Sequence, residues 1–198
     1  VGSEMCIRDS NFTAGGMPGP VMLRGIKFGL PICEDIWQAD VAECLQESGA
    51  DILLALNASP FDSAKPERRM STAVARTVET GLPLIYVNMV GGQDELVYDG
   101  ASFALNADGS LASHLPSFSE TVLQVQLSET AGHIQLNGQI TPPDEGMQAL
   151  YRGVMLGLRD YVHKNGFPGV VLGLSGGIDS ALVACLLYTS DAADEVVR

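Results

Sequence analysis

Apolar runs and helical spacing alternate along the first ninety residues. Short apolar runs predict buried strands over Ile26–Ile32, Asp51–Leu56 and Leu84–Asn88. Between these strands, apolar residues at helical spacing predict one helix over Ala39–Ser48 and another over Pro66–Thr80. Strands and helices that alternate with short connections predict a layered α/β unit.

Glycines mark where both predicted helices end. Gly49 and Gly81 directly follow the last residues at helical spacing, where glycine accepts the left-handed backbone that closes a helix. The apolar face of the first helix comprises Val41, Cys44 and Leu45.

After residue 95 the pattern changes to short alternating runs separated by Asp-Gly pairs. Leu96–Tyr98, Ala101–Asn106 and Leu111–His114 flank Asp99-Gly100 and Asp108-Gly109, so we predict successive antiparallel hairpins. The alternation of Thr121–Leu127 predicts one further strand.

A Gly- and Pro-containing stretch, Gly132–Gly146, is the predicted linker between two units, residues 11–131 and 147–187. The second unit opens with residues at i, i+3, i+4 spacing, which predict an amphipathic helix. Its apolar face comprises Met147, Leu150, Tyr151, Val154, Leu158, Tyr161 and Val162.

A glycine turn then joins a predicted buried strand, Val170–Leu172, to a helix that runs apolar to Leu187. Ser175, Gly176 and Gly177 let the backbone approach a ligand, and the helix N-terminus favours a phosphate-type anion. Asp179 would repel phosphates without a cation, so we interpret it as a Mg²⁺ partner, either a direct ligand or a residue that holds one. No Lys precedes Ser180, which excludes a Walker A loop; the alternative is a turn that binds nothing.

Composition limits the function classes. The net charge of −13 over 198 residues argues against binding to a nucleic-acid backbone. No apolar run has transmembrane length, and residues 1–10 lack the apolar core of a signal peptide. Four irregularly spaced cysteines indicate neither a disulfide framework nor a zinc site, so we expect a cytoplasmic protein.

Both ends differ in pattern from the rest of the chain. Residues 1–10 have no clear period, and the apolar helix changes abruptly to polar sequence at Tyr188. We therefore expect residues 1–10 and 188–198 to be foreign to the fold, and the chain to be a piece of a longer protein.

Cys33 is the candidate nucleophile because it follows a buried strand and precedes an acidic turn. Ligands and catalytic groups collect at strand ends in α/β layers, and a helix N-terminus stabilises a thiolate. The alternative, a small residue packed in the core, is our interpretation of Cys44 and Cys185. No histidine has partner spacing that indicates catalysis or metal binding.

Two stretches resemble known families. The residues GLSGGIDS (173–180) resemble the pyrophosphate loop of ATP-dependent amidating ligases related to NAD synthetase, and LPICEDIW (30–37) resembles the nucleophile motif of nitrilase-like glutaminases. NASPF (57–61) and DELVYDGASF (94–103) fit the same glutaminases. Together they resemble the glutamine-dependent NAD synthetases, over residues 25–127 and 147–187.

That resemblance implies the C-terminal portion of an α-β-β-α sandwich, followed by the first β-loop-α of a Rossmann-like nucleotide-binding domain. Cys33 would attack the glutamine carboxamide, and Glu34, Ser59 and Lys65 would contact glutamine. The ATP site would comprise Gly173, Leu174, Ser175, Gly176, Gly177, Ile178, Asp179 and Ser180. A positive group such as Lys65 suits a substrate carboxylate, although Lys65 can also be a solvated surface residue and Glu34 and Asp35 can cap the following helix.

The resemblance further implies a ligase that uses ATP, Mg²⁺, L-glutamine and deamido-NAD in a homo-oligomeric parent. Its general acid/base glutamate and oxyanion lysine would lie upstream of this chain, so we expect the 198-residue piece to be inactive in both half-reactions. Two alternatives stay open: a stand-alone carbon–nitrogen hydrolase of nitriles or amides, and a non-catalytic piece that associates through apolar surface. For the piece we also expect Leu182, Leu186 and Leu187 to be partly uncovered.

Overall fold

The computed structural model describes residues 16–130 and 132–192. Its elements are, in chain order, β1 (Val21–Leu23), β2 (Ile26–Gly29), the 3₁₀-helix η1 (Cys33–Trp37), α2 (Ala39–Glu47), β3 (Ile52–Asn57), α3 (Lys65–Thr80), β4 (Leu84–Asn88), β5 (Val90–Gln93), β6 (Leu96–Asp99), β7 (Phe103–Leu105), β8 (Leu111–His114), β9 (Gln126–Thr130), β10 (His133–Asn137), α4 (Gly146–Lys164) and α5 (Ile178–Ala192).

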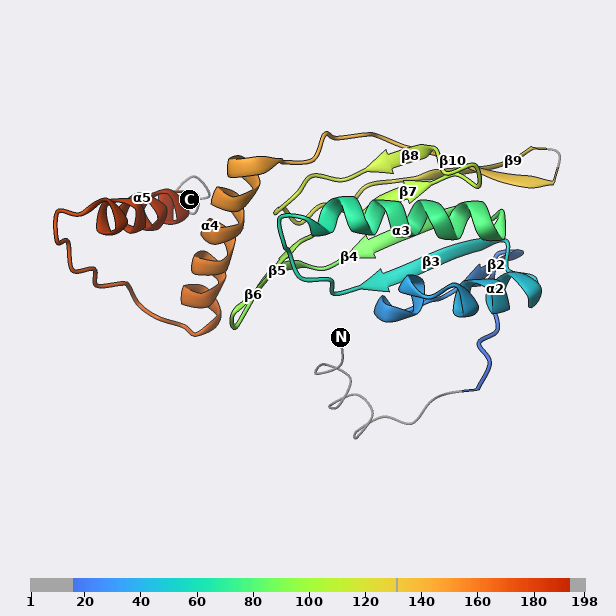
Figure 1. The fold of residues 1–198 in the computed structure, drawn as a ribbon, viewed down its shortest axis with the longest axis horizontal. Coiled ribbons are helices and arrows are strands. Elements are labelled where there is room, and N and C mark those ends of the chain that lie inside the picture. The colour runs from blue at the N-terminus through green and yellow to red at the C-terminus, as the bar shows by residue number, and fades with distance from the viewer. Residues whose placement is uncertain (1–15, 131, 193–198) are drawn as a thin grey trace.

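Six strands form the main sheet in the order β1-β2-β3-β4-β7-β8. Strands β2, β3 and β4 are parallel, and β1, β7 and β8 join antiparallel at the two sides. Helices α2 and α3 connect the parallel strands, as their parallel direction requires (Figure 1). The carboxyl ends of β2, β3 and β4 therefore meet at one edge of the sheet.

The predicted alternation of strands and helices in the first half is confirmed. Strand β4 and helices α2 and α3 lie within one or two residues of the predicted bounds, and Gly81 ends α3 with a left-handed φ of 66°. Strand β2 stops at Gly29, short of the predicted end, because Pro31 has no N–H to donate to a ladder. Cys44 is buried on α2, as predicted.

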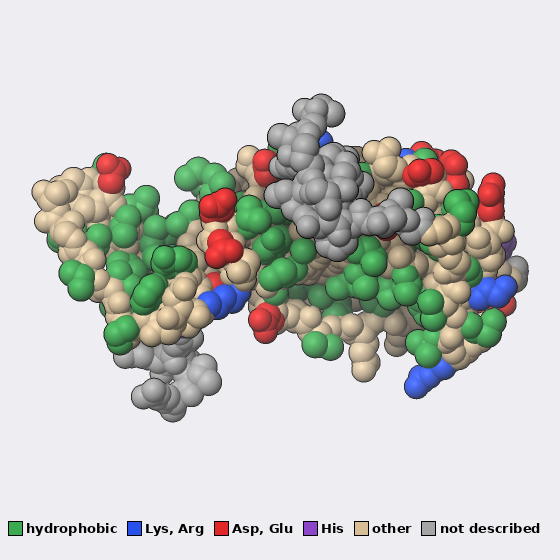
Figure 2. Space-filling view, turned by 90° about the horizontal axis from the view of Figure 1, so that it is seen from below, with side chains coloured by type: hydrophobic (Ala, Val, Ile, Leu, Met, Phe, Trp, Pro, Cys, Tyr) green, Lys and Arg blue, Asp and Glu red, His purple; other side chains and the backbone are tan. Residues whose placement is uncertain are grey.

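The two faces of the sheet are covered differently. Helices α2 and α3 cover one face, over a core that includes Leu45, Leu53 and Tyr86. On the other face Leu136 of β10 belongs to a second buried cluster with Ile52, Ala104 and Ala112. Beyond it, a row of neighbouring side chains at the carboxyl edge stays 40–61% exposed: Ile32, Leu56 and Val87. Hydrophobic side chains form a broad band across the middle of the face drawn in Figure 2.

The predicted hairpin around Asp99-Gly100 is wrong. Strand β6 pairs antiparallel with β5, whereas β7 pairs with β4 and β8. Asp99 does not turn the chain back on itself, because its carboxylate is bound by Arg69 inside the protein. The second predicted hairpin, around Asp108-Gly109, is confirmed by the pairing of β7 with β8.

The strand predicted over Thr121–Leu127 forms only from Gln126, where β9 pairs with β10. The β9–β10 register joins Gln126 to Asn137, so residues 121–125 have no partner strand in this hairpin. Strand β10 also occupies His133–Asn137, inside the predicted linker, and residues 141–145 lead into α4 without helix or strand.

Helix α4 forms, but it buries a different face from the predicted one. Met147, Val154 and Tyr161 are 52–79% exposed, while Ala149, Gly153 and Leu156 are buried. This face is buried because its glycines allow close packing: Gly153 lies against the rings of Phe61 and Phe118, and Gly157 lies against the β5–β6 hairpin.

The α4–hairpin contact joins segments far apart in the sequence (Figure 1). The Gly92 N–H donates to the Asp160 carboxylate over 2.7 Å, and the Lys164 ammonium donates to the Gly92 carbonyl over 2.6 Å. A Cβ at Gly92 would lie 3.0 Å from the Gly157 Cα, so glycine is required for this approach. The helix is thus fixed to the β5–β6 hairpin by hydrogen bonds between its Asp160 and Lys164 side chains and the Gly92 backbone.

The strand predicted over Val170–Leu172 is absent, because no strand among residues 16–130 and 132–192 pairs with it. Helix α5 follows and continues past Leu187 to Ala192. Leu182 is exposed as expected, but Leu186 is buried. Cys185, next to Leu186, is exposed, which corrects its prediction as a core residue.

Residues 1–10, predicted to be foreign, lie outside the described residues. Within the described part, the longest helices are too short or too polar to cross a bilayer.

Candidate active site

Cys33 begins the 3₁₀-helix η1 at the carboxyl edge of the sheet, directly after the bridge that joins Ile32 to Leu56. Its φ is 50°, the left-handed region that costs a non-glycine residue about 1–3 kcal/mol. Asp35 braces this turn: its carboxylate accepts the Ile32 N–H over 2.9 Å, and its own N–H donates to the Ile32 carbonyl over 3.1 Å. Asp35 therefore caps the short helix η1, whereas α2, the predicted helix that follows, has no side-chain cap.

Ser59 lies in the loop after β3 and is 4% exposed. Its N–H donates to the Asn88 side-chain oxygen over 2.9 Å, and its hydroxyl accepts the Arg69 Nε–H over 3.2 Å. The Asn88 amide nitrogen in turn donates to the Gly100 carbonyl over 3.1 Å. The ends of β3, β4 and β6 are thereby tied together around Ser59.

Arg69 and Asp99 form a buried ion pair behind Ser59. The Arg69 Nη1 donates to the Asp99 carboxylate over 2.8 Å, and both side chains are 3% exposed. Burial of a charged group is costly unless it is paired and hydrogen-bonded, and here each partner satisfies the other. The pair brings α3 and the end of β6 into the same site.

Tyr86 of β4 lies beside this network and is 1% exposed. Its ring stacks on Phe103 with centroids 4.8 Å apart. Burial raises the pKa of Tyr86 to about 12, and the Arg69 charge and the nearby Ser59 hydroxyl oppose the rise. Tyr86 therefore lies beside Ser59 and Arg69 and stays protonated at neutral pH.

Glu34 and Lys65 are not in contact with the other predicted residues of the glutamine site. Glu34 is exposed on η1, and Lys65 is half-buried at the first position of α3. No contact of either side chain with Cys33 or Ser59 is found among the described residues, so their roles stay predictions.

The predicted phosphate loop forms a compact turn at the start of α5. Gly176 has a φ of 81°, and the Gly177 N–H donates to the Ser175 hydroxyl over 3.3 Å. The Ser180 hydroxyl donates to the Gly177 carbonyl over 2.9 Å and lies 3.2 Å from the Ser175 hydroxyl. Asp179 is in the first helical turn and is exposed. The loop therefore offers hydroxyls and a helix N-terminus on an open surface.

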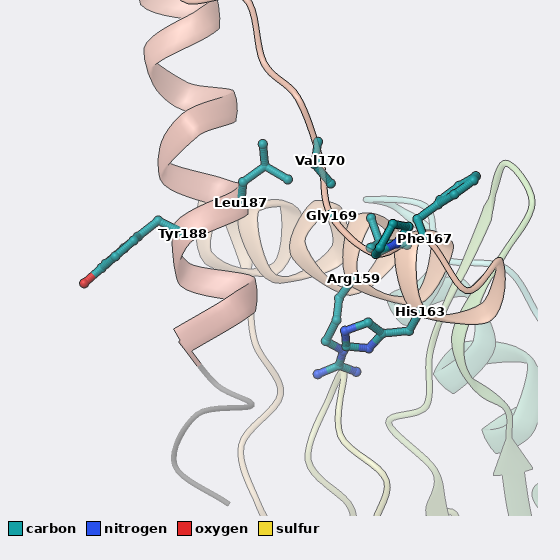
Figure 3. Close-up of a pocket in the computed structure, with 9 residues that line it drawn as sticks. Arg159, His163, Phe167, Gly169, Val170, Leu187 and Tyr188 are labelled. Carbon is teal, nitrogen blue, oxygen red and sulfur yellow. The ribbon is translucent and has the colours of Figure 1, made fainter. Parts of the chain in front are cut away.

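Two cavities lie away from Cys33, Ser59 and the phosphate loop. One of about 380 Å³ lies between α4, the segment before the phosphate loop and the end of α5, where Arg159 and His163 project from one side of α4 (Figure 3). Another of about 710 Å³ lies between α3 and the start of α4 and includes Arg69 and Asp99 in its wall. Neither is lined by Cys33, Ser59 or the phosphate loop.

Sequence reasoning missed Arg69, Asp99, Asn88 and Tyr86. Asn88 had a usable signal, because it ends a parallel strand at the edge where ligand-binding groups collect. Asp99 was assigned to a turn, and nothing in the helical pattern distinguished Arg69 from the adjacent Arg68.

Comparison with known proteins gives the class first. Residues 6–135 match the model of the carbon-nitrogen hydrolase family, so the chain belongs to that family. Residues 150–195 match the NAD synthase family model. The fold is thus a carbon–nitrogen hydrolase unit followed by the start of an NAD synthase domain.

Particular relatives are named glutamine-dependent NAD(+) synthetases. The Rhodobacter capsulatus enzyme is 48% identical over 176 residues, and the match covers 88% of this chain and 32% of that enzyme. The Acinetobacter baylyi enzyme is 39% identical over 173 residues, and the match covers 87% of this chain and 32% of that enzyme. The solved structure of the Acinetobacter baumannii glutamine-dependent NAD+ synthetase with ADP aligns with a TM-score of 0.84 at 37% identity, over 92% of this chain and 35% of that one. The chain spans about a third of the length of these relatives.

Proposed function

We propose that this chain carries the glutaminase nucleophile and the ATP-binding loop of a glutamine-dependent NAD⁺ synthetase. The observation that carries the proposal is the pairing, in one chain, of a cysteine at the carboxyl edge of a carbon–nitrogen hydrolase sheet with a serine- and glycine-rich loop at a helix N-terminus. Relatives matched over most of the chain carry that enzyme's name, which supports it.

In the proposed glutaminase step the Cys33 sulfur attacks the carboxamide carbon of glutamine. The C–N bond breaks, the nitrogen leaves as ammonia after taking up a proton, and water then hydrolyses the thioester to glutamate. Ser59 and Lys65 hold the substrate, with the Lys65 ammonium paired to the α-carboxylate. Glu34 is a further glutamine contact.

In the proposed ligase step the carboxylate of deamido-NAD attacks the α-phosphorus of ATP and releases pyrophosphate. Ammonia then displaces AMP and forms the amide of NAD⁺. Residues 173–180 hold the phosphates through backbone N–H groups and the Ser175 and Ser180 hydroxyls.

Asp179 is the residue that would hold Mg²⁺. The described residues contain no group of three His, Cys, Asp or Glu side chains that could hold a metal ion. Mg²⁺ usually keeps several waters and takes one or two carboxylates plus substrate phosphates, which suits a single exposed carboxylate beside the loop. When bound, the ion neutralises phosphate charge.

The test is a chimera in which residues 16–187 replace the matched segment of the Rhodobacter capsulatus relative. We expect ATP-dependent NAD⁺ formation with either glutamine or free ammonia. Cys33→Ala should abolish the glutamine-dependent rate and leave the ammonia-dependent rate intact. Glutamine-dependent synthesis that survives Cys33→Ala would refute the assignment, and amide hydrolysis without any NAD⁺ formation would favour a stand-alone hydrolase.

A further inference from the structure

The chain on the two sides of Cys33 has different conformations. Before Cys33, the Leu56 N–H donates to the Pro31 carbonyl over 3.1 Å and Ile32 forms a parallel bridge with Leu56. Ile32 therefore stays extended, with φ −117° and ψ 119°. Directly after it the chain enters the 3₁₀-helix η1. Cys33 makes this change of direction within a single residue, which accounts for its left-handed φ of 50°.

The end of η1 is anchored in the core of the sheet unit. Ile36 is 1% exposed and belongs to the buried cluster that α2 and α3 cover. Trp37 packs against the same cluster, and the Arg68 guanidinium lies 5.9 Å from the centroid of its ring. These contacts fix the end of η1 and involve neither Ile32 nor Cys33.

Asp35 connects the extended segment to η1 across Cys33. The Ile32 N–H donates to one oxygen of the Asp35 carboxylate over 2.9 Å, and the Asp35 N–H donates to the Ile32 carbonyl over 3.1 Å. The two bonds close a ring over Cys33 and Glu34, so a change in the Cys33 φ must break or lengthen at least one of them. Strained backbone persists only where its surroundings hold it, and here the Asp35 side chain provides that support.

The backbone of Cys33 determines where its sulfur projects. The backbone torsion angles set the direction of the Cα–Cβ bond, and only χ1 then remains to place the sulfur. A nucleophile must lie close to its productive position, because a misplacement of about 1 Å can cost about 10²-fold in rate. A side chain that holds this φ therefore acts on the chemistry of Cys33 without touching a substrate.

We propose that Asp35 is a positioning residue for Cys33: its carboxylate, bound to the Ile32 N–H, holds the left-handed backbone that directs the thiol. The inference rests on the proposed glutaminase function. It assigns Asp35 the role of a hydrogen-bond acceptor, in which the oxygen matters and the negative charge does not.

The experiment uses the chimera described above and compares its glutamine- and ammonia-dependent rates. Asp35→Ala should lower the glutamine-dependent kcat about 10- to 100-fold and change the KM for glutamine less than about twofold. Asp35→Asn keeps an oxygen that can accept the Ile32 N–H, so its kcat should stay within about threefold of the parent. The ammonia-dependent rate should change less than about twofold in both variants, because ammonia bypasses Cys33. Asp108→Ala is the matched control, since the Asp108 carboxylate also accepts a backbone N–H, from Ser110 over 2.9 Å, in the turn between β7 and β8.

Three results would overturn the proposal. An Asp35→Asn variant as slow as Asp35→Ala would assign the effect to the charge. A raised KM with an unchanged kcat would assign Asp35 to glutamine binding. Asp35→Leu, which keeps the volume of asparagine without its acceptor, replaces Asp35→Ala if that variant does not fold. Loss of the ammonia-dependent rate in both the alanine and the leucine variant would assign Asp35 to folding.

A thermal-unfolding cycle on the full chain tests the positioning without any activity. Cys33→Gly should raise the Tm by about 2–4 °C, because glycine accepts the left-handed φ. In Asp35→Ala the backbone at position 33 is free to relax, so the same substitution should bring no gain. Equal gains in the two backgrounds would show that Asp35 does not hold the strained φ. Failure of the proposed function is recognised separately, by glutamine-dependent synthesis that survives Cys33→Ala.

Discussion

The contact of α4 with the β5–β6 hairpin predicts opposite changes in stability for two glycine-to-alanine substitutions, at Gly92 and at Gly153. A methyl group added at Gly92 would lie 3.0 Å from the Gly157 Cα, 3.1 Å from the Asp160 Cβ and 3.3 Å from the Gly157 carbonyl oxygen. Two of these atoms belong to the backbone of α4, so the helix itself must move. Such overpacking costs about 1–3 kcal/mol.

Gly153 provides the matched control on the same helix. A methyl group there would lie 3.4 Å from the rings of Phe61 and Phe118, which is ordinary contact. Alanine is about 1 kcal/mol better than glycine inside a helix, so Gly153→Ala should stabilise the protein. One kcal/mol corresponds to roughly 2–4 °C in Tm for a chain of this size.

The assay is thermal unfolding followed by circular dichroism, combined with amide hydrogen exchange. Gly92→Ala should lower Tm by about 2–12 °C and Gly153→Ala should raise it by about 2–4 °C. The amide at position 92, which donates to Asp160, should exchange faster in Gly92→Ala only. Equal Tm values for the two variants, or a protected amide at position 92 in Gly92→Ala, would refute the close approach described here.

Three further predictions concern titration and the phosphate loop. Because the pKa of Tyr86 is raised to about 12, its contribution to stability is complete below pH 10 and is lost as the pH rises toward 12, by at most about 3 kcal/mol. Urea unfolding of Tyr86→Phe should show a smaller loss of stability at alkaline pH, and an identical loss would contradict the assignment. Burial lowers the pKa of His114, so stability should fall as the pH drops below about 6.5, and His114→Gln should flatten that acid limb in the same assay. Gly176 has a left-handed φ, so Gly176→Val should abolish the NMR shifts that Mg-ATP causes at residues 175–180, whereas Gly169→Ala, where a methyl group meets open space, should retain them; the loop would not be the phosphate site if Gly176→Val responded normally.

The parallel half of the sheet could be predicted because each element there is determined locally. The runs at β3 and β4 are apolar on both faces, and α3 has a proline at its start and a left-handed glycine at its end. For these elements the burial pattern, the length and the end signals all agreed.

The remaining differences arise from contacts distant in sequence. Asp99 is followed by a glycine, and this pair is typical of a turn. Only the folded chain shows that Arg69, thirty residues earlier, binds the Asp99 carboxylate. Hydrophobicity alone predicts that the face of α4 with large apolar side chains is buried. In the structure the face with glycines is buried instead, because the hairpin approaches it closely. Val170–Leu172 has the composition of a strand, but a strand requires a neighbour to pair with.

The candidate site likewise contains some residues that the sequence predicts and others that only the fold reveals. Cys33 and Ser59 were identified from short sequence motifs, and Ser59 is buried at the same sheet edge where Cys33 lies. The residues that hold Ser59 come from α3, β4 and β6, and no local pattern connects them.

The left-handed backbone of Cys33 sets two requirements of this protein against each other. Glycine at this position would relieve the strained φ at no steric cost, so Cys33→Gly should give a more stable protein that has lost its thiol. A mutation that improves folding is therefore available at the position of the proposed nucleophile. Screens that select only for thermostability would favour loss of this thiol, and an activity screen is needed to retain it.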